Sequence, residues 1–209
     1  MKAVRLLEYG GQLVFNDVPT PAIARDEILV KIKSTAVNHL DLVKASGTIR
    51  EIFPLDLPWI PGHEFSGVVE QIGSDVAAYA PGDAVFGISE MGGAYAEYLA
   101  VKPATIARKP SNLSFEEAAS EPVASETAWE GIFTHGHLEK GQTILIHGGA
   151  GAVAPMRCDW HRMPAPPSLP QQAATMRPSS TPSAPAGLSI IERRSSRRFC
   201  KRRSMWSST

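Results

Sequence analysis

Short apolar runs and alternating stretches dominate the first part of the chain. Residues 27–34 end in strict alternation of apolar and polar side chains, which is the period of a strand with one buried face. The other short apolar runs are bounded by glycine or by Pro-Gly and Gly-Asp pairs, which favour turns. The pattern predicts a compact, mostly β barrel. Its expected strands are residues 2–7, 27–34, 67–73, 83–87 and 95–101.

The spacing of apolar residues changes near residue 114. Ser114 followed by Glu117 has the spacing of a capping box at the start of a helix, and the apolar positions of residues 118–133 fit helices. Residues 143–147 then form a continuous apolar run, typical of a parallel strand that is buried on both faces. An α/β segment is therefore expected after the barrel.

Composition divides the chain near residue 154. The net charge is zero, yet residues 1–154 hold 11 Lys+Arg and 19 Asp+Glu, for a net charge of −8, whereas residues 155–209 hold 10 and 2, for +8. The second segment also contains 8 of the 17 prolines and one of the 17 glycines. We expect residues 1–154 to fold and residues 155–209 to form a disordered tail.

Some classes of protein do not fit this composition. No apolar run reaches the roughly 18 residues of a membrane-spanning helix, and the N-terminus lacks the apolar segment of a secretion signal. Membrane association is therefore not expected, and the expected location is cytoplasmic. Two cysteines cannot supply a disulfide framework or a four-cysteine zinc site.

A glycine-rich turn follows the predicted strand at residues 143–147. Gly149-x-Gly151-x-x-Ala154 has the form G-x-G-x-x-G/A, in which small residues let the backbone approach a pyrophosphate closely. The helix after such a turn aims its N–H groups at the phosphates. Taken alone, the pattern fits an ordinary turn as well as a dinucleotide site.

A second motif lies upstream of this turn. Gly62-His63-Glu64-Phe65-Ser66-Gly67, followed by Gly73 and Val76, resembles the signature of the medium-chain dehydrogenase/reductase superfamily. Residues 81–85 and 93–98 agree with that family in order and spacing. The resemblance implies a GroES-like β barrel, the start of a truncated Rossmann dinucleotide-binding domain and the tail. The corresponding ranges are residues 1–115, 116–154 and 155–209.

The residue at position 38 distinguishes branches of this family. Zinc alcohol dehydrogenases bind catalytic zinc through a cysteine at this position and through the histidine of Gly-His-Glu, here His63. The chain has Asn38 instead, and residues 1–154 contain no cysteine. We expect His63 to be structural and no zinc to bind. The alternative ligand set of His39, His63 and Glu64 has no recognisable metal-ligand spacing.

Asn38-x-x-Asp41 resembles the zinc-free quinone oxidoreductase branch. The resemblance implies that Asn38 lies beside the nicotinamide and that Asp41 braces the loop; Asn38 as a simple turn residue stays an open alternative. Members often carry tyrosine two residues after the aspartate, and Val43 stands there. Thr127 belongs to a segment that resembles the family's Thr-Ala pair near the nicotinamide, with an ordinary helix position as the alternative.

The function implied by the resemblance is hydride transfer from NADPH, or from NADH, to a quinone or an activated alkene. Zinc does not take part, and no side chain is assigned as catalytic. Relatives of this branch are often homodimers. The implied cofactor-binding residues are Asn38, Thr127, Gly149, Gly151 and Ala154.

The segment after Ala154 does not continue a Rossmann domain. Codons for residues 156–161, read one frame over, allow Ala-Val-Arg-Leu-Ala, which resembles the family's phosphate-binding helix. We infer a frameshift near codon 154 and expect this chain to be inactive. The competing hypothesis is a non-catalytic protein whose basic segment, residues 193–203, binds nucleic acid. No nucleic-acid-binding module accompanies that segment, and nucleic acid is not the expected partner.

Overall fold

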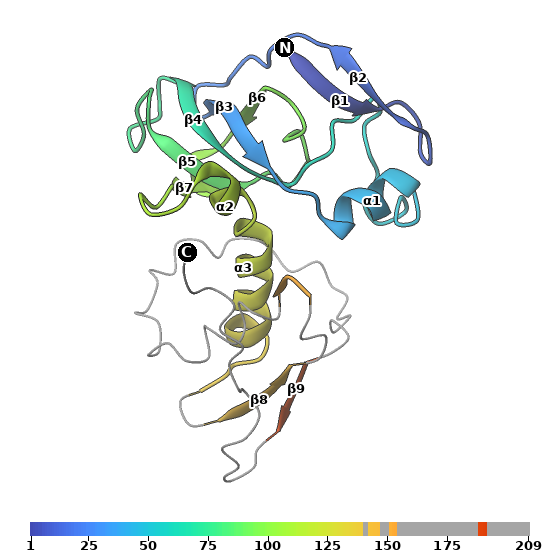
Figure 1. Cartoon of the computed structure of the whole chain (residues 1–209), viewed down its shortest axis with the longest axis vertical. Helices are drawn as coiled ribbons and strands as arrows, with labels where there is room; N and C mark the ends of the chain where they lie inside the picture. The colour runs from blue at the N-terminus through green and yellow to red at the C-terminus, as the bar shows by residue number, and fades with distance from the viewer. Residues whose placement is uncertain (140–141, 147–150, 154–187, 192–209) are drawn as a thin grey trace, which may run out of the picture. The chain divides into compact units, whose positions relative to one another are not determined.

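The computed structural model describes residues 1–139, 142–146, 151–153 and 188–191 (Figure 1). The chain divides into two compact units, Met1–Val123 and Ala124–Thr209. The domain boundaries that the sequence predicts at residues 115 and 154 stay predictions. Most of the predicted tail, including the basic segment, lies outside the described residues.

A five-stranded antiparallel sheet is the centre of the first unit. Its strand order is β6-β3-β4-β5-β7. Three of these strands fall on predicted segments over most of their length, β6 starts three residues late, and β7 was not predicted. The strands are β3 (Ile28–Thr35), β4 (Glu64–Ile72), β5 (Ala84–Ile88), β6 (Tyr98–Val101) and β7 (Ile106–Arg108).

An antiparallel ribbon of β1 (Lys2–Leu6) and β2 (Leu13–Asp17) continues this architecture. The Val4 N–H donates to the Tyr95 carbonyl at 2.8 Å, and the Leu6 N–H donates to the Trp59 carbonyl at 2.7 Å. These bonds join β1 to the loops that precede β4 and β6, as closure of a barrel requires. The sequence did not predict β2, because its apolar side chains are largely exposed and give it no buried face.

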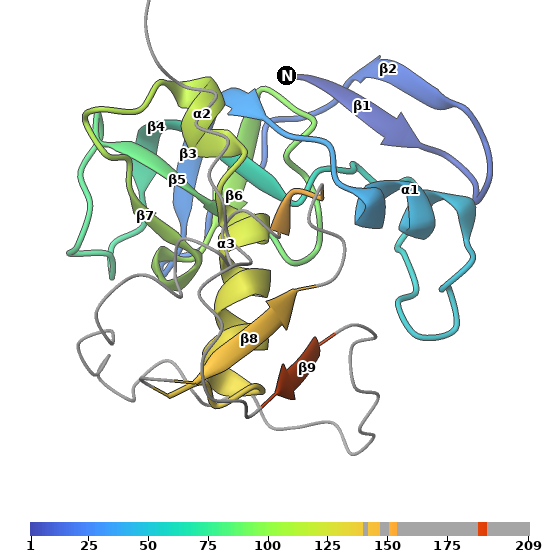
Figure 2. The same ribbon diagram turned by 60° about the horizontal axis from the view of Figure 1, so that its bottom comes forward.

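The core lies on the inner face of the five-stranded sheet. Phe65 of β4 is fully buried at its centre. Helix α2 (Phe115–Ala119) packs against β3, β4 and β5, as Figures 1 and 2 show from two directions. The core side chains are Ile28, Val30, Phe65, Val69, Val76, Val85, Ala94, Leu99, Val101 and Ile106.

The capping box predicted at residue 114 is confirmed. The Glu117 N–H donates to Ser114 Oγ at 3.1 Å, and the Ser114 N–H donates to Glu117 Oε2 at 2.8 Å. The Ser66 hydroxyl of β4 donates to the Phe115 carbonyl at 2.5 Å, which fixes the first turn of α2 to the sheet. Local capping and one bond to the sheet therefore position this short helix.

Replacing Ser114 by alanine removes the hydroxyl oxygen that accepts the Glu117 N–H. The expected loss in free energy of unfolding is about 1 kcal/mol. Chemical denaturation of the purified chain measures it. Ser111→Ala is the matched control, because Ser111 is exposed and precedes the helix. Equal losses in the two variants would show that the cap does not stabilise the fold.

The second unit contains most of helix α3 (Pro122–Trp129), a π-helical turn (Glu130–Thr134) and an antiparallel pair of short strands. The pair consists of β8 (Thr143–Ile146) and β9 (Leu188–Ile191). The sequence predicts β8 as a buried parallel strand, and the structure differs: β8 is antiparallel to β9, and Leu145 is exposed. A parallel neighbour must be joined to β8 by a crossover connection. A strand that runs back in the opposite direction pairs antiparallel instead, as β9 does.

None of the helices among the described residues has the length and apolar character that a membrane crossing needs.

Candidate functional site

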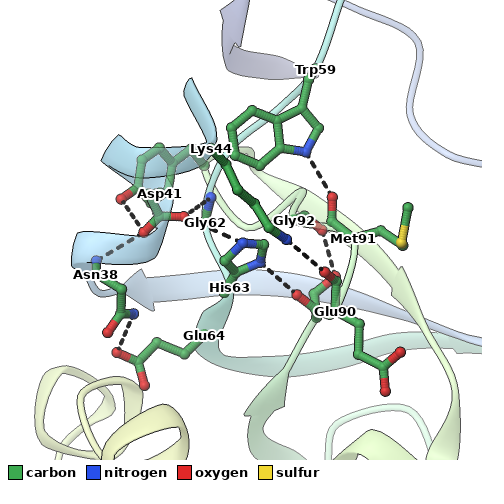
Figure 3. Close-up of polar contacts among 12 residues, drawn as sticks. Asn38, Asp41, Lys44, Trp59, Gly62, His63, Glu64, Glu90, Met91 and Gly92 are labelled. Atoms are coloured by element: carbon green, nitrogen blue, oxygen red, sulfur yellow. Dashed lines mark hydrogen bonds and ion pairs between the residues drawn. The ribbon is translucent and has the colours of Figure 1, made fainter. Parts of the chain in front are cut away.

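Asp41 connects three segments of the first unit (Figure 3). Its Oδ2 accepts the backbone N–H of Asn38 at 2.8 Å and the Tyr95 hydroxyl at 3.2 Å. Its Oδ1 accepts the Gly62 N–H at 3.0 Å. Asp41 is 2% exposed. It joins the start of helix α1 (His39–Ser46) to the turn before β4 and to the loop before β6.

Two features of these loops keep the aspartate in place. Burial, and then the negative charge of Asp41, raise the pKa of Tyr95, so its hydroxyl stays a neutral donor. Gly62 has φ +95°, and a Cβ there would lie 2.4 Å from Tyr95 Cδ1. The turn that offers the Gly62 N–H to Asp41 therefore requires glycine.

Asn38 is held through its side chain as well as its backbone. Its Nδ2 donates to Glu64 Oε1 at 2.8 Å, and Glu64 Oε2 accepts the Val123 N–H at 2.9 Å. Burial raises the pKa of Glu64, and the two hydrogen bonds oppose that rise. The bond to Glu64 directs the amino end of the Asn38 amide inward, so the amide has a fixed orientation.

The His63 ring has one bonded nitrogen and one without a partner. Nδ1 lies 2.9 Å from the Ser89 carbonyl oxygen, and the Ser89 N–H donates to the His63 carbonyl at 2.8 Å. Because a carbonyl only accepts, Nδ1 carries the proton. Within the described residues, buried Nε2 has no hydrogen-bond partner, and Asp41 Oδ1 lies 4.0 Å away.

Lys44 brings a positive charge to the same cluster. Its ammonium donates to the Glu90 carbonyl at 3.4 Å and lies 5.5 Å from the centre of the Phe53 ring, while the residue is 8% exposed. Burial lowers the pKa of Lys44, and the charge of Asp41 opposes this. Burial is also the main cause that lowers the pKa of His63, and the charge of Lys44 adds to it.

The structure brings together part of the predicted site. Asn38 stands at the N-terminus of α1 beside Asp41, whose contacts confirm that it braces the loop. Thr127 is an exposed residue of α3 in the second unit. Gly151 is exposed, whereas Gly149 and Ala154 lie outside the described residues. The assignment of all five to a cofactor stays a prediction.

Sequence reasoning missed Lys44 and the role of Tyr95. The spacing of Asp41 and Lys44, three residues apart, places both on one face of a helix, so recognising α1 would have paired them. Tyr95 was part of a family-like segment, but nothing in the local sequence indicates that its hydroxyl reaches Asp41.

A metal site needs several donor atoms directed at one point. His63 donates Nδ1–H to the Ser89 carbonyl, which leaves Nε2 as its potential ligand atom, but Asn38 presents an amide N–H to Glu64, and an N–H does not ligate metals. Across the described residues, no group of three or more His, Cys, Asp or Glu side chains has an arrangement that could hold a metal ion.

Known proteins share this architecture. Residues 24–111 match the alcohol dehydrogenase GroES-like domain. The 2-methylene-furan-3-one reductase of Solanum lycopersicum is 40% identical over 164 residues, which cover 73% of this chain and 42% of that protein. The quinone oxidoreductase from Coxiella burnetii superposes with a TM-score of 0.70 at 32% identity, over 77% of this chain and 53% of that one. A mycobacterial protein solved in complex with NADPH superposes with a TM-score of 0.68 at 32% identity, over 77% and 49%.

The chain thus spans about half the length of the proteins that it matches. The chain belongs to the medium-chain dehydrogenase/reductase superfamily, in which it is related to quinone oxidoreductases and to a methylene-furanone reductase.

Proposed function

We propose that the protein is an NADPH-dependent reductase that acts on a quinone or an activated alkene without zinc. The names of the matched relatives support the substrate class. The NADPH complex of a structural neighbour supports the choice of cofactor. When bound, the cofactor supplies hydride from nicotinamide C4. A homodimeric assembly and a cytoplasmic location, both expected from the sequence, are part of the same proposal.

The observation that carries the proposal is the Asn38–Glu64 hydrogen bond. A catalytic zinc needs three protein ligands, and the cysteine that zinc alcohol dehydrogenases supply is here an amide directed at Glu64. Without zinc, a simple carbonyl loses the Lewis acid that polarises it. A quinone or an activated alkene stabilises negative charge by itself, so this kind of acceptor fits the site better than a simple aldehyde or ketone.

The chain's own residues contribute orientation to this reaction. Asn38, with its amide fixed by Glu64, would contact the nicotinamide end of the cofactor. Thr127 would contact it from α3. The small residues of the turn at Gly149, Gly151 and Ala154 would allow the pyrophosphate to approach the backbone. The proton that completes the reduction comes from solvent, and no side chain is assigned as a catalytic acid.

The zinc-free assignment has a direct test. The purified chain is expected to contain far less than one zinc ion per molecule by elemental analysis. A chelator is expected to leave its chemical denaturation curve unchanged, because no structural metal is removed. His63→Asn serves as the control, since it keeps an N–H for the Ser89 carbonyl. Stoichiometric zinc that is lost in this variant would overturn the assignment.

A further inference from the structure

The unpartnered nitrogen of His63 is the starting point. A buried polar atom without a hydrogen bond is costly, and most such atoms in folded proteins have a partner. In the neutral ring Nε2 is an acceptor, because Nδ1 carries the proton. Its neighbour at 4.0 Å is a carboxylate oxygen, which is also an acceptor. Two acceptors that face each other cannot bond until a proton arrives.

We propose that His63 and Asp41 form an acid-operated switch at the Asn38 end of the site. When Nε2 takes up a proton, it becomes a donor directed at Asp41 Oδ1. The new N⁺–H···O⁻ bond is short and charge-assisted, so the 4.0 Å gap closes. One hydrogen bond holds the ring on Ser89 and three hold the Asp41 carboxylate, so closing the gap shifts both groups and changes the geometry of the bonds that Asp41 accepts.

Hydrogen bonds of the Asp41 carboxylate transmit its movement to Asn38 and Gly62. The same carboxylate holds the backbone of Asn38 at the start of α1 and the Gly62 N–H before β4. Asn38 in turn keeps its amide on Glu64. Protonation of His63 therefore alters the position of Asn38 without any contact between the two side chains.

The charges around His63 set the pH at which the switch operates. From α1, Asp41 favours the protonated ring and Lys44 opposes it. From residues 89–92, the Ser89 carbonyl favours protonation, while Glu90 faces the cluster through the carbonyl that binds Lys44. The centres of the Trp59 and His63 rings lie 6.1 Å apart, and the neutral Tyr95 hydroxyl donates to Asp41. Glu64 follows His63 on β4 and is bonded to Asn38 and Val123.

The sign of the effect follows from the lowered pKa of His63. The folded chain binds this proton less readily than the unfolded chain, so stability linked to neutral His63 is complete at neutral pH and is lost as the pH falls through the folded pKa. Acid therefore weakens the fold while it drives the His63–Asp41 contact. Lys44 holds the transition at low pH, since its charge disfavours a second positive charge nearby.

NMR of the full chain with ¹⁵N-labelled histidine and asparagine tests the switch. The His63 signals are identified as those missing from His63→Asn. At neutral pH, Nδ1 is expected to be protonated and Nε2 bare, with Nε2 gaining its proton on acidification. The side-chain amide signals of Asn38 are expected to move with the same midpoint. In His63→Asn, those amide signals are expected to stay constant over this pH range.

Lys44→Met supplies the sharper comparison. Removal of this charge is expected to shift the His63 midpoint to higher pH, and the Asn38 midpoint with it. Lys33→Met, at an exposed position of β3, is the matched control and is expected to leave both midpoints unchanged. The proposal is overturned if Nε2 is protonated at neutral pH or if Lys44→Met leaves the His63 midpoint unchanged, as Lys33→Met does. It is also overturned if the amide signals of Asn38 do not change as His63 titrates.

Discussion

The 209-residue chain is expected to oxidise NADPH in the presence of a quinone or an enone at no more than the background rate. A chain in which one or two nucleotides restore the reading frame near codon 154 is expected to recover turnover by on the order of 100-fold or more. Loss of NADPH absorbance measures both rates. Catalysis depends on positions within about 1 Å, and the sequence after Ala154 does not have the helix and strand pattern of the Rossmann domain that is expected to define them.

Two observations support this expectation. A dinucleotide site needs a helix whose N-terminus faces the pyrophosphate, and the eight prolines of residues 155–209 would interrupt such a helix. The site also needs parallel strands beside β8, whereas β8 is antiparallel to β9. Gly151→Val in the frame-restored chain is the control and should abolish NADPH binding. Rapid turnover by the 209-residue chain itself would refute the frameshift hypothesis.

Gly62→Ala is expected to be among the most destabilising single substitutions in the barrel. The positive φ of +95° costs about 1–2 kcal/mol for a residue with a Cβ. The Cβ would also lie 2.4 Å from Tyr95 Cδ1 and 2.9 Å from the Tyr95 backbone nitrogen, and relief of such overpacking costs about 1–3 kcal/mol more. The loss in free energy of unfolding, measured by chemical denaturation, is the sum of both effects.

Gly82→Ala separates these two costs. Gly82 has the same φ of +95°, but a Cβ there meets no heavy atom within 4 Å. This variant is expected to lose only the conformational part, so the difference between the two variants measures the close approach of Tyr95 to Gly62. If both variants lose the same free energy, the tight turn that presents the Gly62 N–H to Asp41 is less constrained than the structure indicates.

Local patterns in the sequence predicted much of the barrel. The segment 27–34, which ends in alternation, corresponds to β3, and the Ser114–Glu117 spacing corresponds to the capping box of α2. In both cases the residues that decide the structure are close neighbours in sequence. Helix α1 was not predicted although Asn38 and Asp41 have the spacing of an N-terminal cap, because the pair was interpreted through its family resemblance or as a turn.

The absence of zinc ligands was also inferred locally, from Asn38 in place of cysteine. The contacts among Asp41, His63 and Tyr95 could not be inferred from local sequence in the same way. Asp41, His63 and Tyr95 come from three separate segments, and their separations of 22 and 54 residues have no fixed spacing that predicts contact. Their meeting depends on the register of β4 against β3 and on the turn at Gly62.

The sequence by itself determined the family, the main strands of the barrel and the missing zinc ligand, because each depends on residue types at short spacing. Only the tertiary structure decided that β8 lies antiparallel to β9, that Glu64 fixes the amide of Asn38, and that His63 Nε2 is buried without a partner. Strand partners and buried polar contacts are set by closure of the sheet over long stretches of chain. Many weak interactions contribute to that closure, so no single residue of the sequence predicts it.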